Sequence, residues 1–159
     1  MAEKTVGMPI AGANMKMYRA PIADTEAWVL VGGIQGVTLD GIEREMVDVD
    51  FRGVEWKASI PGKMNKITAS FKLLHNVAPA MEKLLRDDLL NGTPAKYAFV
   101  NGDITQAGTE GWVIPGYVSA MPRSEEMSDL VSSDMKIELG YVLNSSQTEV
   151  LLPEWLTVA

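Results

Sequence analysis

The side chains that could carry out chemistry are few in this 159-residue sequence, and its single histidine is His75. Nucleophilic catalysis by serine or cysteine needs a histidine with further partners, and none accompanies His75. One histidine cannot build a multi-histidine metal site, and the absence of cysteine excludes disulfides and thiolate metal sites. His75 also lies where an expected strand meets an expected helix. We therefore interpret it as a structural residue.

A run of acidic residues between positions 40 and 50 could supply paired carboxylates or metal ligands. Its members are Asp40, Glu43, Glu45, Asp48 and Asp50. Asp48 and Asp50 would lie on one strand face, about 7 Å apart, which fits an inverting glycoside hydrolase. Almost any alternating strand gives the same spacing, and no aromatic sugar platform stands out nearby. We favour a solvated strand face and predict no catalytic residue, no metal ligand and no enzyme activity.

The glycine-rich segment 32–36 reads Gly-Gly-Ile-Gln-Gly and superficially suggests phosphate binding. It lacks the Gly-Lys-Ser/Thr ending that holds phosphates, and no helical pattern follows whose N-terminus could receive them. A bulge in a strand explains these glycines better. The sequence therefore predicts no bound cofactor.

The charge balance is acidic, with 14 Lys and Arg against 21 Asp and Glu, a net charge of -7. Proteins whose main task is to bind the phosphate backbone usually have a basic face. The N-terminus lacks the apolar segment of a signal peptide, and no run approaches the ~20 apolar residues of a membrane span. We expect a soluble protein, made in the cytoplasm, with no membrane partner.

The clearest strand patterns lie at about residues 42–51 and 65–74, where apolar and polar residues alternate. Each strand is expected to be buried on one face only. The inward residues would be Val47, Val49 and Phe51 in the first strand, and Ile67, Ala69, Phe71 and Leu73 in the second. Residues 52–63 are predicted to form a long loop, because Gly53 and Pro61 interrupt the pattern. Such a loop exceeds the 2–5 residues of a tight hairpin and is typically functional.

Helical spacing replaces the alternation at about residues 77–90. The apolar stripe consists of Val77, Met81, Leu84, Leu85 and Leu89. Asn76 is the expected N-cap, and Gly92 fits just past the C-terminus. With the strand patterns on either side, this predicts a mainly β fold: an antiparallel β-sandwich or open barrel of about seven strands with one flanking α-helix. The expected divisions are an N-terminal arm, the β domain and a C-terminal arm, at residues 1–12, 13–143 and 144–159.

Two tryptophans are difficult to bury inside a single domain. Trp56 lies in the predicted loop, and Trp155 lies in the apolar tail. Exposed large aromatic side chains suggest contact surfaces. These residues point away from catalysis and toward assembly.

The order of the elements resembles that of the major tail tube proteins of tailed phages. The likeness covers residues 13–143 and rests on element order and diffuse pattern, without an invariant motif. Its parts are a glycine-rich turn, the acidic run 43–50, a loop with Gly53, Trp56, Pro61 and Gly62, a one-sided strand, a leucine-rich helix, and late strands at 116–119 and 136–141.

The resemblance implies a structural protein of the virion tail, assembled in the host bacterial cytoplasm. Subunits of that family form hexameric rings, and the rings stack into the tube that conducts viral DNA during ejection. The implied partners are further copies of the chain and other tail proteins, such as the tape measure and the tail terminator. Viral DNA would pass through the lumen without sequence-specific binding.

The resemblance also implies roles for two groups of residues. The long loop after the first main strand commonly reaches the neighbouring ring in that family. The inter-ring candidates are therefore Arg52, Gly53, Val54, Glu55, Trp56 and Lys57. Alternating strands with a polar face suit the water-filled lumen of a wide barrel. The lumen-facing candidates are Asp48, Asp50, Lys66, Thr68, Ser70 and Lys72.

Three alternatives stay open at this point. The same fold serves the tubes of contractile tails and of type VI secretion systems, although we favour a long non-contractile tail. A small-ligand-binding β-barrel would need a large apolar cavity and would stay monomeric. A carboxylate-dependent hydrolase would lose activity on Asp48→Asn or Asp50→Asn.

Overall fold

The computed structural model describes residues 15–23, 25–50, 52–53, 55–124 and 131–159. These residues are mainly β with one helix, α1 (Pro79–Asn91), as the sequence predicted. The strands are β1 (Lys16–Pro21), β2 (Val29–Leu30), β3 (Ile34–Asp40), β4 (Arg44–Val49), β5 (Ala58–Met64), β6 (Thr68–Leu74), β7 (Ala95–Val100), β8 (Glu110–Ala120), β9 (Arg123–Ser124), β10 (Ser132–Leu139) and β11 (Glu154–Thr157). No helix in the described part of the chain has the length and hydropathy needed to cross a membrane.

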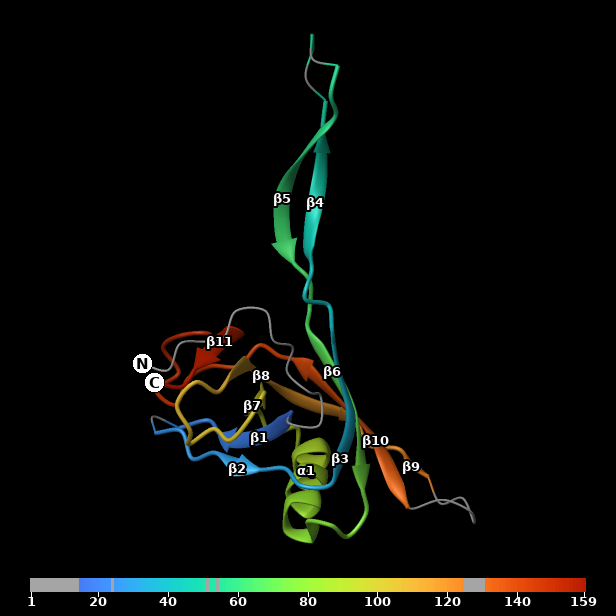
Figure 1. The fold of residues 1–159 in the computed structure, drawn as a ribbon, viewed down its shortest axis with the longest axis vertical. Helices are drawn as coiled ribbons and strands as arrows, with labels where there is room; N and C mark the ends of the chain where they lie inside the picture. The colour runs from blue at the N-terminus through green and yellow to red at the C-terminus, as the bar shows by residue number, and fades with distance from the viewer. Residues whose placement is uncertain (1–14, 24, 51, 54, 125–130) are drawn as a thin grey trace.

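Within the described residues, nine strands form one antiparallel sheet. Its main path is β2-β1-β7-β8-β10-β6-β3, while β11 pairs with β8 and β9 pairs with β10. Side chains from both halves of this path meet in the same core: Met17 and Tyr97 from one half, Phe71 and Met135 from the other. The sheet is therefore curled around that core, with α1 packed beside it (Figure 1). The sequence predicted either a β-sandwich or an open barrel, and the curled sheet corresponds to the open barrel.

Strand β6 and the residue before it follow the predicted alternation. The buried residues are Ile67, Ala69, Phe71 and Leu73. Thr68 and Ser70 are half-buried and Lys72 is exposed on the opposite face. Strand β7 is instead buried on both faces, because a second apolar cluster covers Ala98 and Val100. The core thus forms where side chains from different strands of the same chain pack against one another.

Helix α1 begins at Pro79, although the pattern predicted residues 77–90. Gly92 ends it in the left-handed region, with φ of 65°, where glycine has no steric penalty; this confirms the predicted C-terminus. Asn76 is not the N-cap. That position is taken by Ala78, which makes no side-chain capping hydrogen bond. Proline at the start of a helix loses no intrahelical hydrogen bond, so the helix can begin there without a side-chain cap.

The buried face of α1 is also rotated from the predicted stripe. Met81 and Leu85 are buried against the sheet, whereas Val77 and Leu84 are exposed. The reason is that polar side chains occupy part of the inner face, where Glu82 and Asp88 are buried as well.

Strands β4 and β5 form a ribbon separate from the sheet, and the ribbon projects from the domain (Figure 1). This corrects the expected burial of strand 42–51: Val47 is exposed, Val49 is half-buried, and Phe51 lies outside the described residues. It also corrects the predicted loop 52–63, since β5 occupies much of it. Both strands of the ribbon are edge strands, and edge strands can accommodate proline and glycine, as at Pro61.

The C-terminal segment, expected as an arm at 144–159, adds one strand to the sheet. Strand β11 pairs antiparallel with β8, so that Trp155 lies opposite Trp112. A bridge between Leu143 and Val150 closes the turn before it. The expected N-terminal arm, residues 1–12, lies outside the described residues.

Candidate functional site

The acidic run and the glycine-rich segment have structural explanations. Asp48 is exposed on the ribbon and accepts a hydrogen bond from the Ser59 hydroxyl on the paired strand (2.9 Å). No cluster of three or more His, Asp or Glu side chains suited to a metal ion occurs among the described residues.

In the glycine-rich segment, the pairing of β3 with β6 shifts register between Gln35 and Thr38, and Gly36 has φ of 61°. That is the predicted strand bulge.

His75 belongs to a polar cluster that joins the end of β6 to the first turn of α1. Its Nδ1 lies 2.7 Å from Oε1 of Glu82, and the backbone N–H of Asn76 donates to Oε2 (3.1 Å). Burial alone would raise the pKa of Glu82. The hydrogen bonds from His75 and Asn76, with the charge of Arg86, outweigh burial and lower that pKa below its ordinary value. The cluster holds the strand-to-helix turn, in agreement with a structural role for His75.

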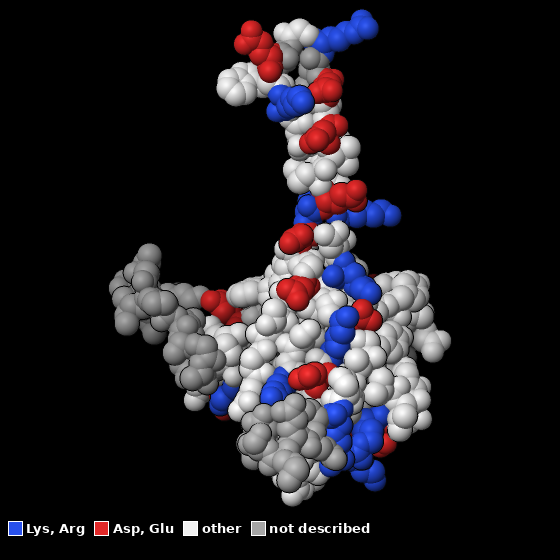
Figure 2. All heavy atoms as spheres, turned by 90° about the vertical axis from the view of Figure 1, so that its right-hand side faces the viewer, with Lys and Arg blue, Asp and Glu red and all other residues white. Residues whose placement is uncertain are grey.

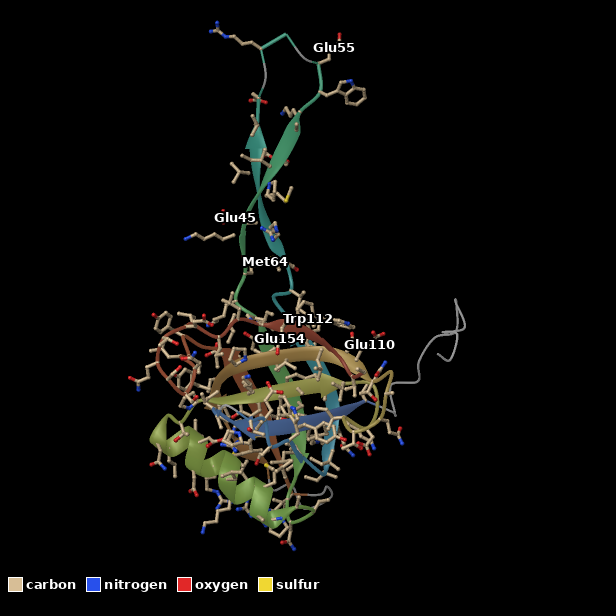
Figure 3. All side chains as sticks on the ribbon, turned by 90° about the vertical axis from the view of Figure 1, so that its left-hand side faces the viewer. Glu45, Glu55, Met64, Glu110, Trp112 and Glu154 are labelled. Atoms are coloured by element: carbon tan, nitrogen blue, oxygen red, sulfur yellow. The ribbon has the colours of Figure 1, made fainter. Side chains whose placement is uncertain are left out.

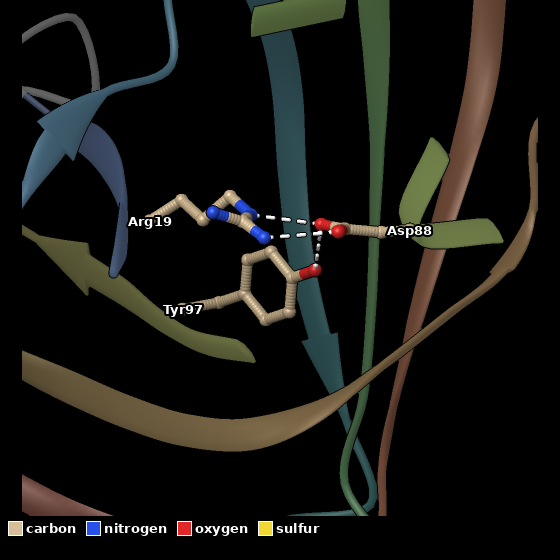
Figure 4. Close-up of polar contacts among 3 residues, drawn as sticks. All are labelled: Arg19, Asp88 and Tyr97. Carbon is tan, nitrogen blue, oxygen red and sulfur yellow. Dashed lines mark hydrogen bonds and ion pairs between the residues drawn. The ribbon is translucent and has the colours of Figure 1, made fainter. Parts of the chain in front are cut away.

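A buried ion pair, which the sequence analysis missed, connects three elements (Figure 4). Arg19 on β1 donates from Nε to Oδ2 of Asp88 (2.8 Å) and from its terminal nitrogen to Oδ1 (2.9 Å). The hydroxyl of Tyr97 on β7 donates to the same carboxylate (3.3 Å). Burial and the charge of Asp88 raise the pKa of Tyr97. Asp88 follows Met81 and Leu85 at helical spacing, so the sequence already placed this carboxylate on the inner face of the helix. A carboxylate at such a position indicates a buried polar partner.

The ribbon carries several large apolar side chains that are exposed. Its exposed apolar side chains are Met46, Val47, Trp56, Ile60 and Met64, from 47% to 81% exposed. Figure 3 shows these strands extending away from the domain, with Glu45 along the ribbon and Glu55 at its end. A hairpin with nothing packed on it is marginally stable in water, and clustered exposed apolar side chains mark contact surfaces. The ribbon is therefore a candidate assembly element.

The predicted inter-ring residues gather at the end of this ribbon. Arg52, Gly53, Glu55, Trp56 and Lys57 are all exposed there, and Val54 lies outside the described residues. We call residues 52–57 the ribbon tip. Trp56 is 81% exposed, the most exposed of the large apolar side chains in the described part of the chain. The structure thus brings these candidates together at the point farthest from the domain (Figure 1).

The predicted lumen residues separate into two groups. Thr68, Ser70 and Lys72 share the outer face of β6, and Lys66 lies just before that strand. Asp48 and Asp50 instead lie on or beside the ribbon. Their assignment assumed that Val47 is buried on the other side of the strand, and Val47 is exposed. Whether any of these residues faces a lumen stays a prediction.

The outer face of β6 continues onto its two neighbouring strands. Residues of β3 and β10 pair with Thr68, Ser70 and Lys72 in register. We call the combined surface the polar sheet face; it consists of Gln35, Thr38 and Asp40 on β3, Thr68, Ser70 and Lys72 on β6, and Asp134, Lys136 and Glu138 on β10, with Lys66 at its border. Side chains at these positions are polar throughout.

The charges of the polar sheet face cancel. Among its described residues, Lys66, Lys72 and Lys136 balance Asp40, Asp134 and Glu138, three positive charges against three negative ones. Lys66 Nζ lies 3.0 Å from Oε1 of Glu138, and this hydrogen bond lowers the pKa of Glu138. Figure 2, which views the molecule from the side of β3, β6 and β10, shows acidic and basic side chains interspersed. A polar surface with mixed charge can face water without holding a charged polymer tightly.

No protein-family model and no curated protein matches this sequence. Solved structures do match. The SPP1 tail tube has a TM-score of 0.69 and 17% sequence identity, over 94% of this chain and 80% of that chain. The tail of an empty gene transfer agent particle, determined with C6 symmetry, has a TM-score of 0.65 and 12% identity, over 83% of this chain and 95% of that chain.

A third match is the sheath-tube complex of an extracellular contractile injection system, PVC, in its extended state. Its TM-score is 0.56 at 10% identity, over 96% of this chain and 95% of that chain. Identities this low establish the fold alone. Since each match covers 80% or more of both chains, this chain has the tail tube fold, which phage tail tubes share with the tubes of contractile injection systems.

Proposed function

We propose that this protein is the tail tube subunit of a long-tailed phage. Its copies form hexameric rings, and the rings stack into the tube through which viral DNA is ejected. The fold supports the proposal, because the matched structures are tails and tubes, one of them with C6 symmetry. In this role the protein is a structural part of the virion tail, assembled in the host cytoplasm, and needs no catalytic residue.

The observation that carries the proposal is the projecting ribbon. In an isolated subunit Met46, Val47 and Ile60 stay exposed on strands that nothing in the described chain covers. A neighbouring subunit in a stacked ring would bury them, and each buried Å² of apolar surface contributes roughly 25 cal/mol. The ribbon tip would then be the inter-ring contact that the sequence predicted for residues 52–57.

The polar sheet face suits the lumen of such a tube. DNA carries one negative charge per ~1.7 Å and would bind a basic wall tightly. A face with balanced charges, such as this one, attracts the DNA phosphates only weakly, so the duplex can move past it. Further partners of the tube would be the tape measure protein inside it and a terminator at its end; one matched structure is a sheath and tube terminator.

A contractile injection system is the second candidate, and the match to an extended sheath-tube complex over 96% of the chain favours it. Both candidates predict the same tube. They differ in whether a sheath surrounds it and in what passes through it.

Electron microscopy of the purified protein at high concentration tests both candidates against a monomeric binding protein. Stacked rings with sixfold symmetry are the expected result. A uniform population of monomers at every concentration would contradict the proposal.

A further inference from the structure

A groove of about 600 Å³ lies at the base of the ribbon. Its apolar lining consists of Met64, Ile67, Trp112, Leu139, Leu152 and Pro153. The lining comes from the end of β5, the start of β6, strands β8 and β10, and the segment before β11. Met64 is 50% and Leu152 is 73% exposed, so the groove is open to solvent. Apolar grooves of this kind are typical binding sites.

A second aromatic residue extends this surface. Trp155 packs edge-on against Trp112, with ring centroids 5.5 Å apart, and is itself exposed. Figure 3 shows Met64, Trp112 and Glu154 near one another where the ribbon leaves the domain, and Glu55 at the opposite end of the ribbon. The chain therefore has an apolar groove at one end of the ribbon and an exposed tryptophan at the other.

The charges around the groove and around the ribbon tip are complementary. At the tip, Trp56 stands between Glu55 and Lys57 in the sequence, and all three are exposed. At the groove, Arg44 and Lys66 belong to the lining, and Lys66 is also hydrogen-bonded to Glu138. The exposed Glu154 directly follows Pro153 of the lining. Each surface thus combines apolar side chains with acidic and basic neighbours.

The tip of a given chain does not reach the groove of that chain, because the ribbon separates Glu55 from Met64 and Trp112 (Figure 3). We propose that Trp56 of one copy docks into the groove of a second copy, with Glu55 facing Arg44 and with Lys57 facing Glu154. This inference rests on the proposed function and names the surface that receives the ribbon tip. A tryptophan buried in this way removes about 150–250 Å² from water.

The contact would be heterologous, since two different surfaces of the same chain meet. Each copy offers a tip to one neighbour and a groove to another, so the contact can repeat from subunit to subunit. Repetition of this kind builds rings or extended stacks, whereas a self-complementary contact would stop at a dimer.

Disulfide trapping tests the contact directly, because the sequence has no cysteine. The variant Glu55→Cys/Leu152→Cys is assembled under reducing conditions and then mildly oxidised. We expect a ladder of covalent oligomers on a non-reducing gel, reduced at least several-fold by Trp56→Ala in the same background. Glu55→Cys/Lys83→Cys, with the second cysteine on the exposed side of α1, is the matched control and should give no ladder.

Electron microscopy of the same samples separates the outcomes. Tubes together with a ladder from the Leu152 pair support the inference. Tubes without that ladder, or with an equal ladder from the Lys83 pair, would overturn it and leave the proposed function standing. Folded monomers of the wild-type chain, with no tubes and no ladder from the variant, would overturn both.

Discussion

The curled sheet and the ribbon use the same sequence pattern with opposite results. In β6, alternation buries Phe71 and leaves Lys72 exposed. In β4, the same alternation leaves Val47 exposed beside Asp48. The difference is the covering surface: strands and a helix of the same chain cover one face of β6, whereas the ribbon carries its apolar side chains away from the domain (Figure 1).

This contrast separates stability from assembly. The sheet and α1 together enclose the buried core and the ion pair of Arg19 with Asp88, so we expect them to fold as a single copy. The ribbon adds exposed apolar side chains that do not contribute to that core. We expect substitutions in the sheet to change the free energy of unfolding and substitutions in the ribbon to change tube formation.

The largest effect on stability is expected at the buried ion pair. Asp88→Ala leaves the Arg19 guanidinium buried without its partner, and breaking a buried pair costs about 3–5 kcal/mol. Chemical denaturation of the variant checks this. Asp87→Ala, one position away on the same helix, is the control and should change the free energy of unfolding by about 0.5 kcal/mol or less. Similar losses for the two variants would remove the distinction between core and surface on α1.

The next effect concerns two adjacent leucines of α1. Leu85 is fully buried and Leu84 is 38% exposed. Leu85→Ala should lower the free energy of unfolding by about 2–5 kcal/mol, as for core leucines, and Leu84→Ala by clearly less. Urea titration of both variants measures the difference. A greater loss at Leu84 would show that the helix docks with the stripe predicted from the sequence.

A several-fold effect is expected on DNA passage. Thr68→Lys/Ser70→Lys adds positive charge to the polar sheet face, so particles carrying it should eject DNA more slowly at low salt and at the normal rate at high salt. Asp48→Lys/Asp50→Lys places the same residue type on or beside the ribbon and should leave ejection unchanged. Ejection rate measured against ionic strength tests both. Slowing by the ribbon pair alone would assign the lumen to Asp48 and Asp50.

The smallest effect is on the pH dependence of stability. The pKa of Glu82 is lowered in the folded protein, so its carboxylate stabilises the fold above the ordinary glutamate pKa of about 4.3. That contribution is lost as the pH falls through the lowered value. The stability difference between wild type and Glu82→Gln should therefore shrink between about pH 5 and pH 3. Glu45→Gln, exposed on the ribbon, is the control. A difference that does not depend on pH would contradict this role of Glu82.

The sequence predicted the elements whose partners lie in the same chain. Alternation identified the buried residues of β6, and Gly92 marked the end of α1, because local backbone preference and burial agree there. The mainly β antiparallel class and the tail tube fold were likewise predicted and confirmed.

Prediction failed where burial depends on another surface. Val47 alternates with acidic residues as a half-buried strand would, but a pattern does not say whether the covering surface belongs to the same molecule. Pro61 was read as a loop signal because the edge position of β5 was not known. The pair of Arg19 with Asp88 joins residues 69 positions apart in the sequence. Spacing in the sequence does not indicate whether residues so far apart are close in space.

Removal of the ribbon tests the central claim most directly. The N–H of Asn65 donates to the carbonyl of Glu43 (2.8 Å), so the chain on either side of residues 44–64 already meets and can be joined by a short Gly-Ser link. The shortened protein should keep the far-ultraviolet spectrum and the cooperative unfolding of a folded β domain, and electron microscopy should show no tubes where the full chain forms them. Tubes of normal length from the shortened protein would contradict the account.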